Sequence, residues 1–97
     1  MNTSSEEKFV LPNVLSLGAA EQLRENLVQR LVLGSDITID ASQVDAITTP
    51  CMQVIISAGN TFEDAGSQVT IEAPSPAFIE AFNDLGFNDI FEKWSVK

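Results

Sequence analysis

The side chains best placed for chemistry lie around the start of a predicted helix at Thr49-Pro50. An apolar run that ends at Asp40 leads into a polar loop, residues 41–48, just before this helix. Unpaired backbone N–H groups and the helix dipole favour negative charge at such a start, so it could hold a phosphate. The Thr49 hydroxyl could therefore carry a phosphoryl group, or it could simply cap the helix. The residues alone favour the cap, because Ser75-Pro76 repeats the pattern where no function is suggested.

Catalysis has little support in the residue types. The chain contains no histidine and a single cysteine, Cys51. This excludes intrachain disulfides, Cys/His zinc sites and nucleophile pairs that need an imidazole. The carboxylates show no metal-loop spacing, and no phosphate-binding glycine loop is present. We therefore expect no enzyme, no cofactor and no metal site. The helix dipole could turn Cys51 into a redox sensor, but a small buried hydrophobe is the favoured interpretation.

The charge balance restricts the partners. Fourteen acidic residues stand against five basic ones, for a formal net charge of −9. Such a surface repels nucleic acids and anionic lipids, since binding either requires clustered lysine or arginine. A basic protein partner would suit it, although the charge could also serve solubility alone. No signal peptide or membrane-spanning stretch is evident, so we expect a cytoplasmic protein with no direct membrane insertion.

The hydrophobic periodicity predicts alternating strands and helices in one domain. At 97 residues the chain is too short for a second core. We predict a flexible tail over residues 1–7 and a folded domain over residues 8–97. Glycines 34, 66 and 86 are expected to end helices. The predicted strands are residues 9–11, 14–15, 37–40 and 69–71, and the predicted helices cover residues 18–33, 49–65, 76–85 and 87–94.

This order of elements indicates an α/β fold. Strands separated by crossover helices favour a largely parallel sheet, with residues 37–40 as a central strand. We expect a small mixed sheet with about four helices packed mainly on one face.

The segment from Asp40 to Val54 resembles the signature of the STAS family. In that family a strand ending in Asp-Leu-Ser is followed by an apolar pair and by Asp-Ser-Ser-Gly at a helix start. Here Asp40-Ala41-Ser42 matches the strand end, and Ala46-Ile47 matches the apolar pair. Thr48 falls on the family's Asp and Thr49 on its phosphorylatable Ser. The likeness runs from about residue 9 to residue 91.

All four residues that fall on the family's Asp-Ser-Ser-Gly differ from it, and the Asp is lost at Thr48. Pro50-Cys51 stands where the family has Ser-Gly, which adds bulk and removes one N–H. Thr49 in place of Ser keeps the hydroxyl. The run Thr49–Val54 looks more like a short STAS branch associated with bacterial chemotaxis systems.

The resemblance implies a regulatory protein similar to the antagonists of anti-sigma factors. Such a domain would bind a histidine-kinase-like ATPase, a switch kinase that is also an anti-sigma factor, and phosphorylation of Thr49 would release it. The resemblance also leaves open a structural subunit that braces the ATPase of a lipid transporter. A nucleotide- or lipid-binding domain ranks last, and self-association stays open. The candidate contact residues are Ser42, Asp45, Thr48, Thr49, Met52 and Gln53.

Overall fold

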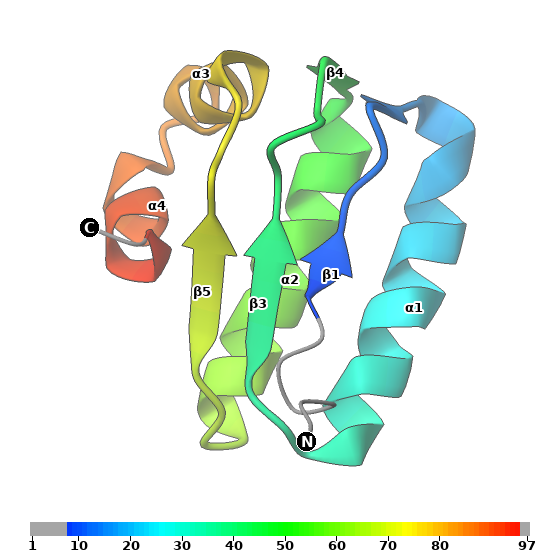
Figure 1. The fold of residues 1–97 in the computed structure, drawn as a ribbon, viewed down its shortest axis with the longest axis vertical. Coiled ribbons are helices and arrows are strands. Elements are labelled where there is room, and N and C mark those ends of the chain that lie inside the picture. Colours follow the sequence, from blue (N-terminus) through cyan, green and yellow to red (C-terminus); the bar gives the residue numbers. More distant parts are fainter. Residues whose placement is uncertain (1–7, 96–97) are drawn as a thin grey trace.

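The computed structural model describes residues 8–95, in which short parallel strands alternate with helices (Figure 1). The expected flexible tail, residues 1–7, and the last two residues of the expected domain lie outside this range. The strands are β1 (Phe9–Val10), β2 (Val14–Leu15), β3 (Ile37–Asp40), β4 (Ala46–Ile47) and β5 (Val69–Glu72). The helices are η2 (Leu17–Ala19, a 3-10 turn), α1 (Ala20–Leu33), α2 (Thr49–Asp64), α3 (Pro76–Asp84) and α4 (Asn88–Trp94).

The main sheet has the order β1-β3-β5, with β3 at its centre as predicted. A second, two-stranded sheet pairs β2 with β4. The α/β class is confirmed, but the expected mixed strand directions are wrong for the described residues, because every strand pair is parallel. The physical reason is that a helix lies between the two strands of each pair, and a crossover returns the chain in the same direction.

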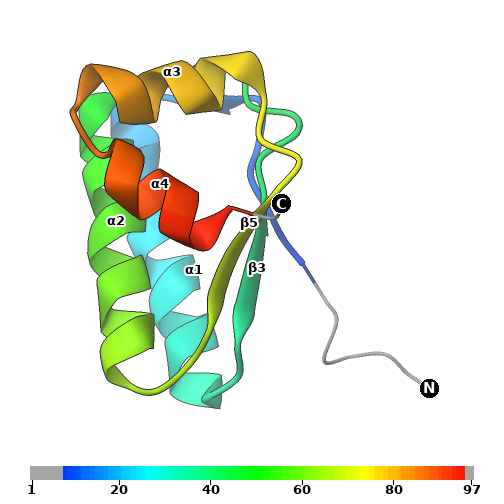
Figure 2. The ribbon, with the colours of Figure 1, turned by 90° about the vertical axis from the view of Figure 1, so that its left-hand side faces the viewer.

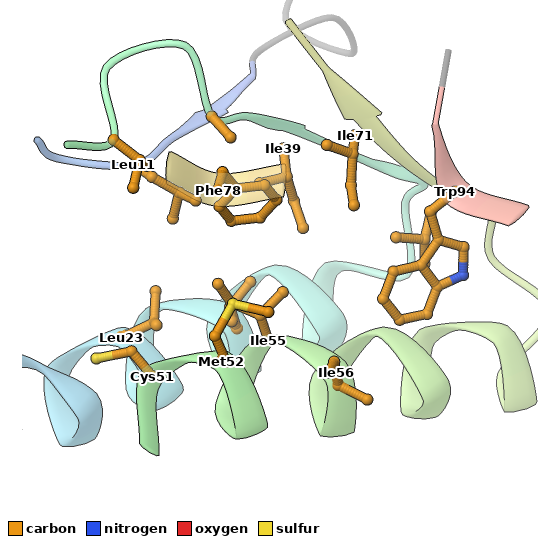
Figure 3. Close-up of a cluster of buried hydrophobic side chains, with 14 of the residues drawn as sticks. Leu11, Leu23, Ile39, Cys51, Met52, Ile55, Ile56, Ile71, Phe78 and Trp94 are labelled. Carbon is orange, nitrogen blue, oxygen red and sulfur yellow. The ribbon is translucent and has the colours of Figure 1, made fainter. Parts of the chain in front are cut away.

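All four α-helices lie on one side of β3 and β5, as expected (Figure 2). The residues of both strands alternate between buried and half-buried, so one face of the sheet meets the helices. Ile39 and Ile71 point from the sheet toward Met52 and Ile55 of α2 (Figure 3). Burial of these apolar side chains is the main force that holds the helices to the sheet.

Three helices end close to the glycines that the sequence predicts as helix ends. Gly34, Gly66 and Gly86 all have positive φ, at 77°, 89° and 78°. Each lies within two residues of the last residue of a helix, where an L-residue with a side chain would be strained.

The C-terminal helix is fixed to α2 through Trp94. The indole ring covers Gly59, where even a methyl group would collide with it. The indole N–H donates to the Glu63 carboxylate at 2.9 Å, and Lys93 Nζ lies 3.1 Å from the other carboxylate oxygen. The hydrogen bond from Trp94, followed by the one from Lys93, lowers the pKa of Glu63. The contact with the Trp94 ring therefore explains why residue 59 is a glycine.

Candidate functional site

Loops that follow β3 and β5 meet at the carboxyl end of the main sheet, at the top of Figure 1. Ala41 N donates to Glu72 O at 3.2 Å, and Ser75 N donates to Ala41 O at 3.1 Å. The Ser75 hydroxyl donates to Val44 O at 2.6 Å. These bonds join two loops that are thirty residues apart in the sequence and fix the path of the chain toward α2.

Strand β2 holds the last residues before α2. Asp45 N donates to Asn13 O at 2.7 Å, and Thr48 N donates to Leu15 O at 3.1 Å. The Thr48 hydroxyl donates to the same Leu15 carbonyl at 3.2 Å. The expected loop, residues 41–48, therefore contains a short strand, β4, because β2 lies beside it and pairs with its backbone.

The start of α2 differs from the expectation by one residue. Thr48 occupies the N-cap position with extended backbone angles, and Thr49 is already the first helical residue. The expectation that Thr49 caps the helix is therefore wrong, because Pro50 occupies the second helical position rather than the first. No side chain caps α2, since the Thr48 hydroxyl is engaged with Leu15. Thr49 is exposed to solvent.

Asp40 stabilises the loop that follows β3. Its carboxylate accepts a hydrogen bond from Ser42 N at 2.9 Å. This bond is the main reason why the pKa of Asp40 lies below its ordinary value. The hydrogen bond closes a tight local turn at the end of β3, of the kind that Asp favours.

The candidate contact residues divide between the surface and the core. Ser42, Asp45, Thr49 and Gln53 are exposed around the start of α2, and Thr48 is half-buried. Met52 is only 1% exposed, so its placement among the surface contacts needs correction. Thr49 and Gln53 lie one turn apart on the exposed face of α2, and the Met52 side chain points toward the sheet instead (Figure 3).

Cys51 is fully buried, and its Sγ donates to Ser16 O at 3.3 Å. This environment agrees with a small core hydrophobe and offers no access to an oxidant.

Two hollows flank the first turns of α2. A groove of about 500 Å³ runs between α1 and α2, with Val28, Val54 and Ala58 among its apolar side chains and Gln53 at its edge. A smaller pocket of about 200 Å³ lies between the start of α2 and α3, and Thr49 contributes to its wall. Residues at the start of α2 therefore contribute to both hollows, Pro50 to the groove and Thr49 to the pocket, and concave surfaces are suited to binding.

The sequence interpretation missed the α3 side of this pocket. Glu80 and Asp84 line it together with Leu85. Their spacing of four residues predicts one helix face, but which face meets α2 depends on how α3 packs. Among residues 8–95, no three metal-ligating side chains come together. Within the same range, no helix combines the length and the apolar character needed to cross a membrane.

Comparisons with known proteins add a family assignment. A family model described as "Mlab, STAS domain" matches residues 3–92, which is most of the chain. A search of curated proteins found no match.

Proposed function

The chain belongs to the STAS family, and on this premise we propose that it works by binding a protein partner through the start of α2 rather than by catalysis. The observation that carries this proposal is that the exposed Thr49 and its neighbour Pro50 line two separate hollows at the start of α2. The contact surface would comprise Ser42, Asp45, Thr48, Thr49 and Gln53. The net charge of −9 favours a partner with a basic docking face, because opposite potentials speed the encounter.

Phosphorylation of Thr49 would switch this binding off. Thr49 is the first residue of α2, and its hydroxyl forms no hydrogen bond within residues 8–95, so it is free to react. A phosphoryl group would add nearly two negative charges and considerable bulk at the centre of the contact surface. Docking would then require the removal of water from a dianion, which weakens the complex. The domain would thus exchange partners according to its phosphorylation state.

We propose that the partner is a histidine-kinase-like ATPase that acts as switch kinase and anti-sigma factor, in a sigma-factor or chemotaxis pathway; the resemblance to the antagonists of anti-sigma factors supports this proposal. Such an ATPase would both phosphorylate Thr49 and release the modified domain.

The experiment that tests the switch is affinity capture from native cell extract, with three baits compared by mass spectrometry. We expect wild type and Thr49→Val to retain the same ATPase, and Thr49→Glu to lose it by at least about tenfold in affinity, about 1.4 kcal/mol. Thr49→Val is the matched control because it keeps the shape of the side chain without charge. Circular dichroism should be the same for all three proteins. An ATPase retained equally by all three baits would rule out Thr49 as the switch.

A second candidate function is a structural subunit that braces a transporter ATPase of the lipid-transport type and does not switch. Two departures from the family's phosphorylated motif favour this second function. Pro50 adds bulk beside Thr49, and the buried Cys51 stands where the family has glycine. This function predicts capture of a membrane transporter ATPase, held equally by wild type and Thr49→Glu.

A further inference from the structure

The pocket between α2 and α3 is lined by both apolar and acidic side chains. It measures about 200 Å³ and is open to solvent. Three of its side chains, Ile47, Met52 and Leu85, are apolar, and two, Glu80 and Asp84, are acidic. The remaining lining residues are Thr49, Ala77 and Ala81. A side chain that fits this pocket must therefore combine an apolar stem with a positively charged end.

The two acidic side chains have no ion-pair partner within the described part of the chain. The ion pairs of residues 8–95 join Lys8 to Glu72 and Lys93 to Glu63. Glu80 and Asp84 are both exposed and lie one helical turn apart on α3, where two like charges repel each other. A cation placed between them would remove this repulsion and gain attraction from both carboxylates.

We propose that this pocket receives an arginine side chain of the protein partner. The inference rests on the proposed binding function and specifies the chemistry of the partner at the same surface. An arginine suits the pocket better than a lysine, because its planar guanidinium can donate to two carboxylates at once. Its three methylene groups would lie against the half-buried Ile47 and Leu85 while the charged end stays near water.

This occupant also gives phosphorylation of Thr49 a local consequence. Thr49 lines the same pocket, so a phosphoryl group on its hydroxyl would stand beside the bound guanidinium. The phosphate would attract the guanidinium, so release of the partner would depend on the added bulk and on the water that the dianion holds. The pocket thereby connects modification of Thr49 directly to the contact that the partner makes with Glu80 and Asp84.

The test uses the full chain, labelled with ¹⁵N, and N-acetyl-arginine amide as the probe in a low-salt NMR titration. We expect saturable shifts of the Thr49, Ala77 and Ala81 amides. N-acetyl-citrulline amide, which has the same shape without the charge, should produce none. The double variant Glu80→Gln/Asp84→Asn should bind the arginine probe with an affinity lower by about tenfold or more. The matched control is Glu21→Gln/Glu25→Gln, an exposed pair with the same spacing on α1 and outside the pocket, and it should bind the probe like wild type.

Three results would overturn the inference: no saturable shift with arginine, equal shifts with citrulline, or equal weakening by the α1 control pair. The outcome is separable from that of the proposed function. If the captured ATPase binds Glu80→Gln/Asp84→Asn as tightly as wild type, the pocket inference fails while the switch at Thr49 stands. If Thr49→Glu retains every partner, the switch fails even where the arginine probe binds.

Discussion

Helices α2 and α3 begin with the same sequence device, a hydroxyl residue followed by proline, and use it differently. At α3, Ser75 is the N-cap, and its hydroxyl accepts from Phe78 N at 3.2 Å while donating to Val44 O at 2.6 Å. At α2, the N-cap Thr48 donates to Leu15, and Thr49 stands exposed beyond it. One hydroxyl is fully used by the fold and the other is left to solvent, so only Thr49 is available for the proposed modification.

The largest effect that this comparison predicts is on stability at Ser75. Ser75→Ala removes the cap of α3 and the bond to Val44 O, so we expect the free energy of unfolding to fall by about 2 kcal/mol. Urea denaturation followed by circular dichroism measures this loss. Thr49→Ala is the matched control and should change stability by less than about 0.5 kcal/mol. Similar losses in both variants would mean that the two helix starts do not differ in the proposed way.

A smaller effect is expected at Thr48. Thr48→Val removes the hydroxyl bond to Leu15 O, but that carbonyl still accepts from Thr48 N. We therefore expect a loss of about 1 kcal/mol or less, again by urea denaturation. Thr48→Ser keeps the hydroxyl and should lose less than Thr48→Val. A stability gain in the valine variant would show that the hydroxyl bond adds nothing to the attachment of α2 to β2.

The smallest expected effect is the loss of stability at acid pH that comes from Asp40 in the loop leading to α2. The pKa of Asp40 is lowered in the folded state, chiefly by the hydrogen bond from Ser42 N. Its contribution to stability is therefore present above the unfolded pKa of about 3.9 and is lost as the pH falls through the lower folded value. Asp40→Asn keeps an acceptor oxygen but does not titrate. The stability difference between wild type and this variant, measured from pH 6 to pH 2, should shrink on acidification, and a constant difference would contradict the assignment.

Most of the fold could be predicted from local signals. Gly34, Gly66 and Gly86 end helices because the backbone needs positive φ there, and Ser75-Pro76 starts α3 as its residues suggest. Strand β4 could not be predicted, because its two residues lie inside a polar loop and become a strand only by pairing with β2.

The candidate site was harder to predict because it depends on details of one turn. Thr48 and Thr49 both carry hydroxyls, and proline fits the first or the second helical position, so the sequence pattern places the cap one residue too late. The same pattern does not fix the phase of α2, which buries Met52. The position of Glu80 and Asp84 opposite Thr49 cannot be predicted from the sequence, because it arises only when α3 packs on α2.

The contact of Trp94 with Gly59 has a practical consequence. Trp94 is the only tryptophan of the chain, which also lacks tyrosine, so the near-ultraviolet emission comes from one buried indole. Unfolding would release this ring from Glu63 into water and shift its emission to longer wavelength. Because Trp94 lies in the terminal helix and lines neither hollow beside α2, its fluorescence reports folding separately from occupation of the partner surface. The protein thus carries its own optical probe for separating variants that unfold from variants that only fail to bind.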